Sequence, residues 1–299
     1  MKHAVSISLG SPTRDKKVVM NFNGTEVLVE RIGTGGDIKI AKSLYEEMDG
    51  QVDAFGVGGV DLYIRLDGRE YPLHAALKLV EHVRHTPLVD GRGLKHTLER
   101  RVFELARPML REDPVFRKAF VPVAVDRIGL AQAVCEVTDT VTFGDLMVAL
   151  GIPIPIRGLK NYKRVARMML PFVSHFPMSM LFYGSGGEQG KPKFGKYWEE
   201  SDLFAGDFLF MKKYLPADIS GKTVVTNTTT EENRRMLRER GAKLVITTTP
   251  TYEGRSFGTN MMEAALTAYA GKGRRLTDDE LNALIDELGL VPSVRYLDD

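Results

Sequence analysis

Residues 120–143 read FVPVAVDRIGLAQAVCEVTDTVTF, and this stretch decides the fold class. Its residue pattern predicts an apolar strand at 120–125, a helix at 127–137 and a second strand at 140–143. A strand, a helix and a strand in close succession form the βαβ unit, in which the two strands lie parallel. The alternation continues with strands expected at 203–205, 223–227 and 243–248. The sequence therefore predicts an α/β protein with a C-terminal Rossmann-like parallel sheet and helices on both of its faces.

The N-terminal part of the chain mixes hairpins with short helices. Asn23-Gly24 and Asp67-Gly68 each separate two β-rich runs, and both dipeptides are typical of two-residue hairpin turns. Asp37 is expected to cap a helix that runs to Met48. A further helix is expected over 94–110. This part is therefore expected to form an α/β domain of its own.

The segment 111–114 is charged and contains a proline, so we place a domain boundary near residue 118. Residues 1–118 would form the N-terminal α/β domain that binds the substrate, and 119–299 the Rossmann-like domain that binds a dinucleotide. Within the second domain we expect a strand at 178–183. The glycine- and lysine-rich stretch 184–198 is expected to be a surface loop that closes over a cleft between the domains.

Composition limits the classes of function. The chain has 299 residues, 43% of them apolar, and its 41 basic and 39 acidic side chains leave a net charge of +2. Such a balance lacks the basic excess typical of proteins that bind nucleic acids or anionic membranes. A single cysteine, Cys135, excludes an intramolecular disulfide, and the six histidines form no His-Glu-x-x-His motif, so no metal site is predicted. No apolar run reaches the ~20 residues of a membrane span. We expect a cytoplasmic protein that binds a small molecule, and the sequence is compatible with a homodimer.

The junction between the first parallel strand and its helix carries the first candidate site. Ligands of doubly wound sheets bind beyond the carboxyl ends of the strands, where helix N-termini offer free N–H groups. Asp126 and Arg127 stand at this junction, Gly129 follows in the helix, and Asp145 comes 19 positions after Asp126. That spacing is typical of dinucleotide-binding units, in which the later acid holds the ribose. Only Gly129 matches a glycine of the Gly-x-Gly-x-x-Gly fingerprint, so a helix cap at Asp126 and a turn at Asp145 remain the alternative.

Two neighbouring strand ends are rich in side chains that form hydrogen bonds. The first holds Thr226, Asn227 and Thr228, and the second holds Thr247 and Thr248. Threonine also favours strands and helix caps, which would explain one such cluster. Two clusters at adjacent strand ends favour binding, so we assign these five residues to the cofactor together with Asp126, Arg127, Gly129 and Asp145. Arg255, which follows the second cluster, could supply a counter-charge to the substrate.

A glycine-rich motif follows an apolar strand of the N-terminal part. It reads Gly56-Val57-Gly58-Gly59-Val60-Asp61, and glycines in this position let a ligand or another backbone approach closely. We assign Gly58, Gly59 and Asp61 to substrate binding, with close packing as an equally good explanation.

The segment 89–101 holds the densest set of residue types that carry catalysis. Asp90 follows a strand, and Lys95 stands near the start of the next helix. A lysine beside an aspartate can exchange a proton with a substrate hydroxyl, so Lys95 and Asp90 are the predicted catalytic pair. Glu99, Arg100 and Arg101 are expected to form a solvated helix face.

Three stretches, 53–63, 86–101 and 221–260, resemble a bacterial family labelled quinate/shikimate 5-dehydrogenase. The resemblance implies an N-terminal substrate domain, a C-terminal domain that binds NAD or NADP, and a catalytic lysine and aspartate. Lys95 and Asp90 are the nearest candidates, although their order and spacing depart from the two separate motifs of that family. Asn227-Thr228-Thr229-Thr230 stands at a different place from the family's Asn-Thr-Asp-Gly motif.

Two hypotheses follow for the function. The first is an NAD(P)-linked dehydrogenase of a polyhydroxylated cyclic acid similar to quinate or shikimate. The second is a non-catalytic α/β protein that binds a nucleotide or a phosphorylated metabolite. The threonine-rich strand ends and the absence of an intact glycine fingerprint favour it.

Overall fold

The computed structural model describes residues 1–181, 194–252 and 255–298, which form two compact units. Among these residues, unit 1 comprises 1–94, 169–181 and 258–289, and unit 2 comprises 95–168, 194–252, 255–257 and 290–298. The chain passes from unit 1 to unit 2 between Leu94 and Lys95, whereas the sequence placed a boundary near residue 118. The segment after Leu94 belongs to unit 2 because its helix α4 (Val102–Ala106) packs against α5 (Ile128–Glu136).

Unit 1 contains a five-stranded sheet in the order β2-β3-β1-β4-β7. Its strands are β1 (Lys2–Ser8), β2 (Lys16–Phe22), β3 (Thr25–Gly33), β4 (Ala54–Gly58) and β7 (Leu88–Val89). Only the edge strand β2 is antiparallel to its neighbour. The hairpin predicted at Asn23-Gly24 joins β2 to β3, with φ angles of 48° and 87° that suit a type I′ turn. The hairpin predicted at Asp67-Gly68 joins β5 (Tyr63–Leu66) to β6 (Arg69–Pro72) in the same way.

The helices of unit 1 come from distant parts of the sequence. They include α1 (Ile38–Met48), α2 (His74–Leu77), α7 (Met178–Leu181), α11 (Thr259–Ala270) and α12 (Asp278–Glu287), with a 3₁₀ turn η1 at Pro12–Arg14. As predicted, Asp37 caps α1 by accepting hydrogen bonds from the N–H groups of Lys39 and Ile40. Helix α11 packs on β1, β3 and β4, so the C-terminal region completes the N-terminal sheet.

Two predicted elements of the chain are wrong. The strand expected at 178–183 is helix α7 as far as Leu181, because Pro177 starts a turn in which its carbonyl accepts from Met180 N–H. Residues 182–183 and most of the predicted loop 184–198 lie outside the described residues. The helix expected over 94–110 is broken into α3 (Arg92–His96), α4 and a 3₁₀ turn η2 (Arg107–Met109). The second break follows from Pro108, which has no N–H to continue an α-helix.

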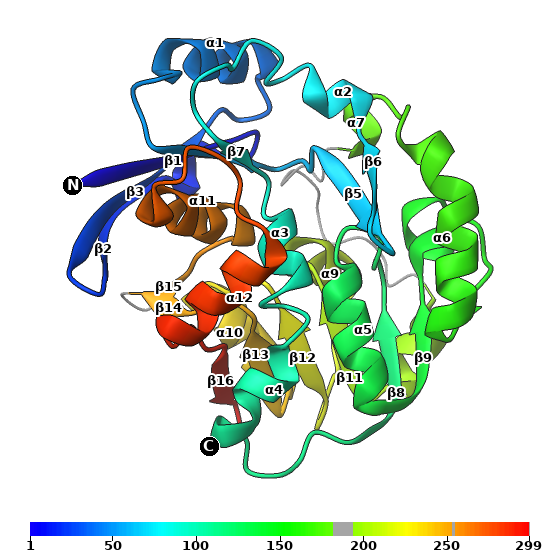
Figure 1. The fold of residues 1–299 in the computed structure, drawn as a ribbon. Helices are drawn as coiled ribbons and strands as arrows, with labels where there is room; N and C mark the ends of the chain where they lie inside the picture. Colours follow the sequence, from blue (N-terminus) through cyan, green and yellow to red (C-terminus); the bar gives the residue numbers. More distant parts are fainter. Residues whose placement is uncertain (182–193, 253–254, 299) are drawn as a thin grey trace. The chain divides into compact units, whose positions relative to one another are not determined.

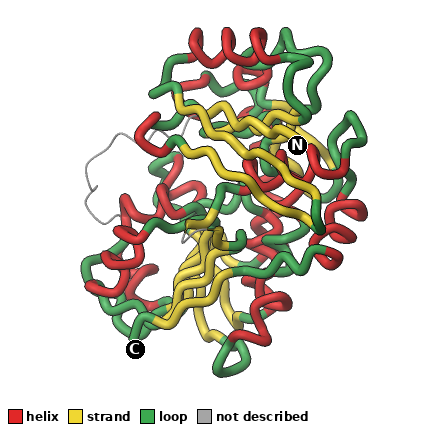
Figure 2. Tube along the Cα trace, turned by 90° about the vertical axis from the view of Figure 1, so that its left-hand side faces the viewer, coloured by secondary structure: helices red, strands yellow, loops and turns green. Residues whose placement is uncertain are grey.

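Unit 2 contains a seven-stranded sheet in the order β10-β9-β8-β11-β12-β13-β16 (Figures 1 and 2). Its strands are β8 (Phe116–Val121), β9 (Thr138–Phe143), β10 (Ile156–Arg157), β11 (Leu203–Gly206), β12 (Thr223–Thr226), β13 (Leu244–Thr247) and β16 (Ser293–Tyr296). The five central strands are parallel, and the two edge strands are antiparallel. The predicted Rossmann-like sheet is therefore confirmed. Strand β8 ends earlier than expected because Pro122 has no N–H for the sheet.

The chain reverses its direction of travel across this sheet at β8. From β8 it crosses outward to β9 through α5, and it later returns to β11 on the other side of β8. The remaining helices of unit 2 are α6 (Leu159–Val173), α8 (Gly195–Glu200), α9 (Phe208–Tyr214) and α10 (Glu231–Glu239), of which α6 begins in unit 2 and ends in unit 1. Unit 2 also contains a π-helical turn, η3 (Asp145–Ala149), and a small hairpin of β14 (Thr251–Tyr252) and β15 (Arg255–Ser256). Side chains of α8, α9 and α10 form a core with the central strands around Trp198, Phe204 and Leu237. The carboxyl ends of β8 and β11 thus form a topological switch point, where open α/β sheets bind ligands.

None of the helices in the described part of the chain is long and apolar enough to cross a membrane.

Candidate active site

A buried group of charged and amide side chains lies at the switch point of unit 2. We call it the switch-point cluster, and its members are Lys95, Glu99, Asp126, Arg127, Asp207 and Asn227. Lys95 lies in α3, and Glu99 lies in the turn before α4. The others follow the strand ends: Asp126 and Arg127 follow β8, Asp207 follows β11, and Asn227 follows β12. The parallel sheet therefore brings polar groups from three separate strand ends to one edge.

Arg127 is the centre of the cluster. Its side chain is 5% exposed and donates through Nη1 to the Glu99 carboxylate and through Nη2 to Asp207 Oδ2 at 2.9 Å. Asp207 Oδ2 also accepts from Asn227 Nδ2 at 2.7 Å. The planar guanidinium presents several donors in fixed directions, which suits an arginine that joins two carboxylates. Arg127 therefore ties the start of α5 to α9 and to the turn after α3.

Lys95 and Asp126 form a second pair beside Arg127. Lys95 Nζ lies 3.8 Å from Asp126 Oδ2, and the two side chains are 6% and 12% exposed. Asp126 Oδ2 also lies 3.5 Å from Arg127 Nε. Charges that are largely removed from water interact more strongly than surface charges. A lysine in this setting can hold or release a proton beside a fixed carboxylate, which is the arrangement that general acid–base catalysis needs.

Glu99 corrects one prediction, because it is completely buried rather than solvated. One carboxylate oxygen, Oε1, bonds Arg127 and accepts from Thr248 Oγ1 at 3.4 Å, while Oε2 is buried without a hydrogen bond among the described residues. Burial raises the pKa of Glu99, although the positive charges of Arg127 and Lys95 oppose this shift. The break in the predicted helix turns Glu99 inward. Arg100 remains partly exposed, and it pairs with Glu136 of α5.

Gly129 supports the cluster through packing. A Cβ atom at this position would overlap the carbonyl oxygen of Lys95, so only glycine lets the Lys95 backbone lie against the first turn of α5. In a dinucleotide-binding fingerprint, by contrast, a glycine gives the pyrophosphate access to the backbone. The structure thus gives Gly129 a role in placing Lys95.

Asp145 follows β9, as the sequence spacing predicted, but its carboxylate holds the neighbouring loop. Oδ1 accepts hydrogen bonds from the N–H groups of Ala124 and Val125 at 3.0 and 2.9 Å, and from Tyr162 Oη at 3.1 Å. Oδ2 is buried and has no hydrogen bond from the described residues. Burial raises the pKa of Asp145 to about 7 despite these donors. Asp145 therefore fixes the β8–α5 loop that carries Asp126 and Arg127.

The threonine-rich strand ends mostly join loops to one another. Thr226 Oγ1 donates to the Gly206 carbonyl at 2.8 Å, and Thr248 Oγ1 donates to Glu99. Thr247 is buried, and its hydroxyl lies 3.5 Å from the Thr249 carbonyl. Thr228 is half-buried. Of the predicted cofactor residues at these strand ends, Asn227 is a member of the switch-point cluster, and Thr226 and Thr248 contact it, Thr226 Oγ1 by donating to Asn227 Oδ1 at 3.1 Å.

Asp90, the predicted partner of Lys95, belongs to unit 1 and is engaged there by backbone groups. Oδ2 accepts from the N–H groups of Leu62 and Tyr63 at 2.9 and 3.3 Å, and Oδ1 accepts from Arg92 N–H at 3.2 Å. The lysine belongs to unit 2, where its ion pair is with Asp126. Asp90 therefore holds the loop before β5 in place.

The other predicted substrate residues are also in unit 1, except Arg255, whose side chain lies outside the described residues. A Cβ on Gly58 would lie 2.7 Å from Ser8 Cβ and 3.1 Å from Asn260 Nδ2, so this glycine lets α11 begin close to β4. Gly59 has a φ of +84°, a left-handed conformation that glycine adopts readily. Asp61 is half-buried. These contacts favour the packing explanation of the Gly56–Asp61 motif.

Unit 1 contains a second buried acid that the sequence analysis missed. Glu263 lies on α11 with 1% exposure, and its Oε2 accepts from Leu94 N–H at 3.1 Å. Oε1 is buried and has no hydrogen bond among the residues described. Burial and the nearby charge of Asp90 raise the pKa of Glu263 to about 7. The apolar neighbours of Glu263 in the sequence gave no sign of this role.

The raised pKa of Glu263 predicts a measurable pH dependence. The unfolded chain releases this proton near pH 4.5, whereas the folded chain retains it up to about pH 7. The folded state therefore binds more protons between these values, so stability falls as pH rises from 5 to 8, by roughly 2–3 kcal/mol from this group. We expect Glu263→Gln to flatten this decline in urea unfolding at pH 5, 6, 7 and 8. Asp145→Asn is the matched variant for the second acid with a raised pKa, and an unchanged slope in Glu263→Gln would contradict the assignment.

Of the missed cluster members, Asp207 could have been found from the sequence and Glu99 could not. Asp207 stands two residues after the strand predicted at 203–205, and a polar residue just beyond a strand is the same signal that identified Asp126. Glu99 stands among charged residues at helical spacing, and such a pattern is typical of a solvated face.

In the part of the chain that the structure describes, no three His, Cys, Asp or Glu side chains are arranged to hold a metal ion.

Comparison with known proteins identifies two families. Residues 93–297 match the family described as Domain of unknown function (DUF8754), and residues 3–90 match Domain of unknown function (DUF8753). No curated protein matches the chain. Similar solved structures include a malic enzyme from Entamoeba histolytica (TM-score 0.43, 9% identity, 94% of this chain and 61% of that one). Another is an NAD-dependent malic enzyme from Thermotoga maritima (TM-score 0.41, 11% identity, 95% of this chain and 75% of that one). A third is the glucose-galactose binding protein GanP from Geobacillus stearothermophilus (TM-score 0.38, 9% identity, 100% of this chain and 98% of that one).

This chain spans 61% of the length of the Entamoeba enzyme. At these TM-scores, the similarities assign the chain to none of those protein families.

Proposed function

The chain belongs to the DUF8754 family of domains of unknown function, and we propose that its unit 2 binds a small molecule at the switch point and exchanges a proton with it. The observation that supports this most is the buried Lys95–Asp126 pair, which lies beyond the carboxyl end of β8. Switch points are where open α/β sheets bind ligands, and a buried lysine beside a carboxylate is suited to proton transfer.

The chemistry that this pair supports is proton transfer at a hydroxyl or carbonyl group. Once Lys95 Nζ has released a proton, a ligand hydroxyl within hydrogen-bond reach would give its own proton to the amine, and Asp126 would stabilise the ammonium that forms. The reverse transfer would protonate a carbonyl oxygen as it is reduced. Arg127 follows Asp126 in the chain and is bonded to Glu99 and Asp207, so it positions the pair. For a polyhydroxylated cyclic acid of the quinate or shikimate kind, this transfer is the proton half of an alcohol oxidation.

The hydride half of that oxidation would require NAD or NADP, and the β8–α5 junction does not fit the usual binding mode of these cofactors. Gly129 packs against Lys95, and Asp145 bonds to the loop rather than standing ready for a ribose. The positions that normally hold the pyrophosphate and the adenosine ribose of a dinucleotide are thus both engaged within the protein. We therefore derive no hydride step.

Two candidate functions remain, each with an observation in its favour. The parallel strand order and the Lys95–Asp126 pair favour an NAD(P)-linked dehydrogenase that binds its cofactor in an unusual way. The engagement of Gly129 and Asp145 favours a non-catalytic protein that binds a nucleotide or a phosphorylated metabolite.

A ligand screen by thermal unfolding separates the two candidates. NAD, NADP, AMP, sugar phosphates and quinate are added singly to wild-type protein and to Asp126→Asn. A ligand at 100 times its Kd stabilises the native state by about 2.7 kcal/mol, which raises the Tm by several degrees. We expect at least one ligand to stabilise the wild type and to stabilise Asp126→Asn less. Stabilisation by NAD or NADP supports the dehydrogenase, and stabilisation only by nucleotides or phosphates supports the binding protein. An equal shift in both proteins would contradict the switch-point site.

A further inference from the structure

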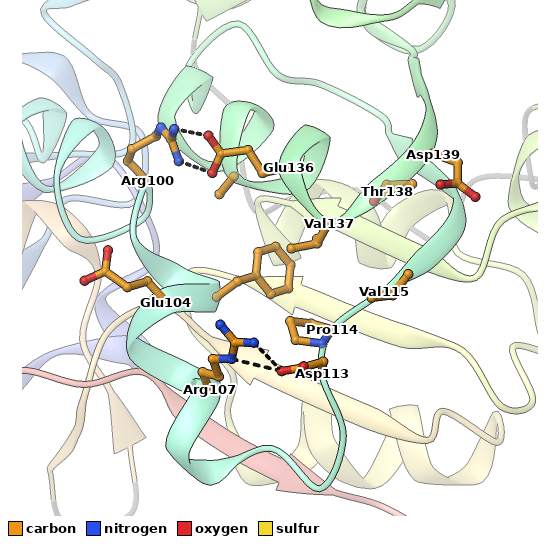
Figure 3. A pocket seen from close by; sticks show the side chains of 12 residues that line it. Arg100, Glu104, Arg107, Asp113, Pro114, Val115, Glu136, Val137, Thr138 and Asp139 are labelled. Atoms are coloured by element: carbon orange, nitrogen blue, oxygen red, sulfur yellow. Dashed lines mark hydrogen bonds and ion pairs between the residues drawn. The ribbon is translucent and has the colours of Figure 1, made fainter.

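A pocket of about 430 Å³ opens at the opposite edge of the same sheet, beside the amino ends of β8 and β9 (Figure 3). Its walls come from α4, η2, the segment before β8, and the end of α5, all within unit 2. This volume is in the range of sites that hold small organic molecules. The pocket lies at the amino ends of the strands and the switch-point cluster at their carboxyl ends, so the two sites are separate.

Part of the lining of this pocket is apolar. Phe103 and Ala133 line it and are 6% and 2% exposed, and Pro114 and Val137 line it as well. Phe103 is held in place by the ring of Phe116, with 6.4 Å between the ring centroids. Pro114 and Val137 are half-buried and Val115 is exposed, so these side chains offer most of the accessible apolar surface. An apolar ligand group that entered would displace water from them, which is favourable.

The charges around the pocket leave an excess of negative charge. Arg100 bonds both carboxylate oxygens of Glu136, and Arg107 Nε donates to Asp113 Oδ1 at 2.9 Å, so both lining arginines are neutralised (Figure 3). The remaining lining acids are Glu104, which pairs with Arg101, and Asp139. Asp139 is exposed and has no ion pair with the residues that the structure describes. Next to it, the hydroxyl of Thr138 is inaccessible and has no hydrogen-bond partner among those residues.

We propose that this pocket binds an organic ammonium compound with an apolar body, such as an arylalkyl amine. The apolar body would cover Pro114, Val115 and Val137, and the ammonium group would lie near Asp139, whose charge is not neutralised by an ion pair with the described residues. A carboxylate or phosphate ligand is disfavoured, because it would have to displace Glu136 or Asp113 from its arginine and would face the charge of Asp139. The structure thus assigns the pocket a cationic, partly apolar ligand.

Calorimetric titration with three probes of similar shape tests this proposal. The probes are 2-phenylethylamine, 2-phenylethanol and 3-phenylpropionate, which carry a positive charge, no charge and a negative charge. An exposed ion pair contributes up to about 1 kcal/mol, so we expect the amine to bind about fivefold more tightly than the alcohol and the carboxylate to bind most weakly. Asp139→Asn should reduce the affinity for the amine to that for the alcohol and leave the alcohol unaffected.

Glu239→Gln is the control, because it removes another exposed acid, one on α10 that does not line the pocket. It should change none of the three affinities. A second variant, Ala133→Met, fills the apolar floor and should weaken all three probes. Equal binding of amine and alcohol, tighter binding of the carboxylate, or an Asp139→Asn variant with wild-type preference would each overturn the proposal. If Ala133→Met does not fold, the affinities of Asp139→Asn for the amine and the alcohol alone decide whether the pocket binds the ammonium group at Asp139.

Discussion

Arg127→Met is expected to destabilise unit 2 by about 3–5 kcal/mol, because it leaves two carboxylates without their shared cation. Glu99 is completely buried, and Asp207 is 29% exposed, so neither group regains full hydration when the guanidinium is removed. Methionine preserves much of the apolar volume of the arginine stem, so the loss reflects the charges rather than a cavity. Trp198, the single tryptophan of the chain, is buried in the core of unit 2 and reports its unfolding by fluorescence in urea.

Arg100→Met is the matched control for this prediction. Arg100 also bonds a carboxylate through both terminal nitrogens, but its side chain is 35% exposed and that of Glu136 is 58% exposed. Surface pairs of this kind contribute about 0–1 kcal/mol. Losses of similar size in the two variants would show that the cluster does not hold the β8–α5 junction. A double variant, Arg127→Met with Glu99→Gln, should recover part of the loss, because it removes one of the unpaired charges.

The difference between these two arginines shows how far the sequence alone could be interpreted. Strands and helices of unit 2 were predictable because apolar runs alternate with capped helical segments. The return of α11 and α12 to unit 1 was not, because an apolar helix face does not specify which sheet it will cover. The sequence placed Arg127 at a strand end and Arg100 on a solvated helix face, but neither position specifies the carboxylate that the arginine bonds. Only the tertiary structure decides that one pairs at the surface and the other in the interior.

The candidate site was predictable to the extent that it depends on topology. Asp126, Arg127, Asn227 and Thr248 were identified because polar residues at the ends of parallel strands gather at one edge. Their partners depend on side-chain packing, which the spacing of residues does not encode. Lys95 was therefore predicted to carry a proton but was paired with Asp90, since that aspartate is nearer in the sequence. In the structure, Asp90 accepts hydrogen bonds from backbone N–H groups, and Lys95 forms an ion pair with Asp126.

For the switch-point chemistry, Lys95→Met is expected to lower kcat by about 10²- to 10⁴-fold in any reaction that the ligand screen reveals, which is the usual contribution of general acid–base catalysis. Methionine cannot carry a proton, but it fills the space of the lysine stem, so ligand affinity should change much less than kcat. Such a split would show that the amine acts on the reacting group rather than on binding alone. Turnover by Lys95→Met within a factor of about three of the wild type would remove this role.

Lys95→Arg distinguishes proton transfer from a structural ion pair. Arginine keeps a positive charge beside Asp126, so the stability of unit 2 should stay close to that of the wild type. Its guanidinium stays protonated at every accessible pH, so it cannot serve as a base. We therefore expect Lys95→Arg to be folded, to bind the ligand and to be as slow as Lys95→Met. If Lys95→Arg restores turnover, the lysine is needed only for its charge, and the pair with Asp126 then serves to place the β8–α5 loop. The screen could instead yield a ligand that undergoes no reaction. In that case, binding that is lost in Lys95→Met and kept in Lys95→Arg would identify a non-catalytic site, in which the positive charge at position 95 contacts the ligand.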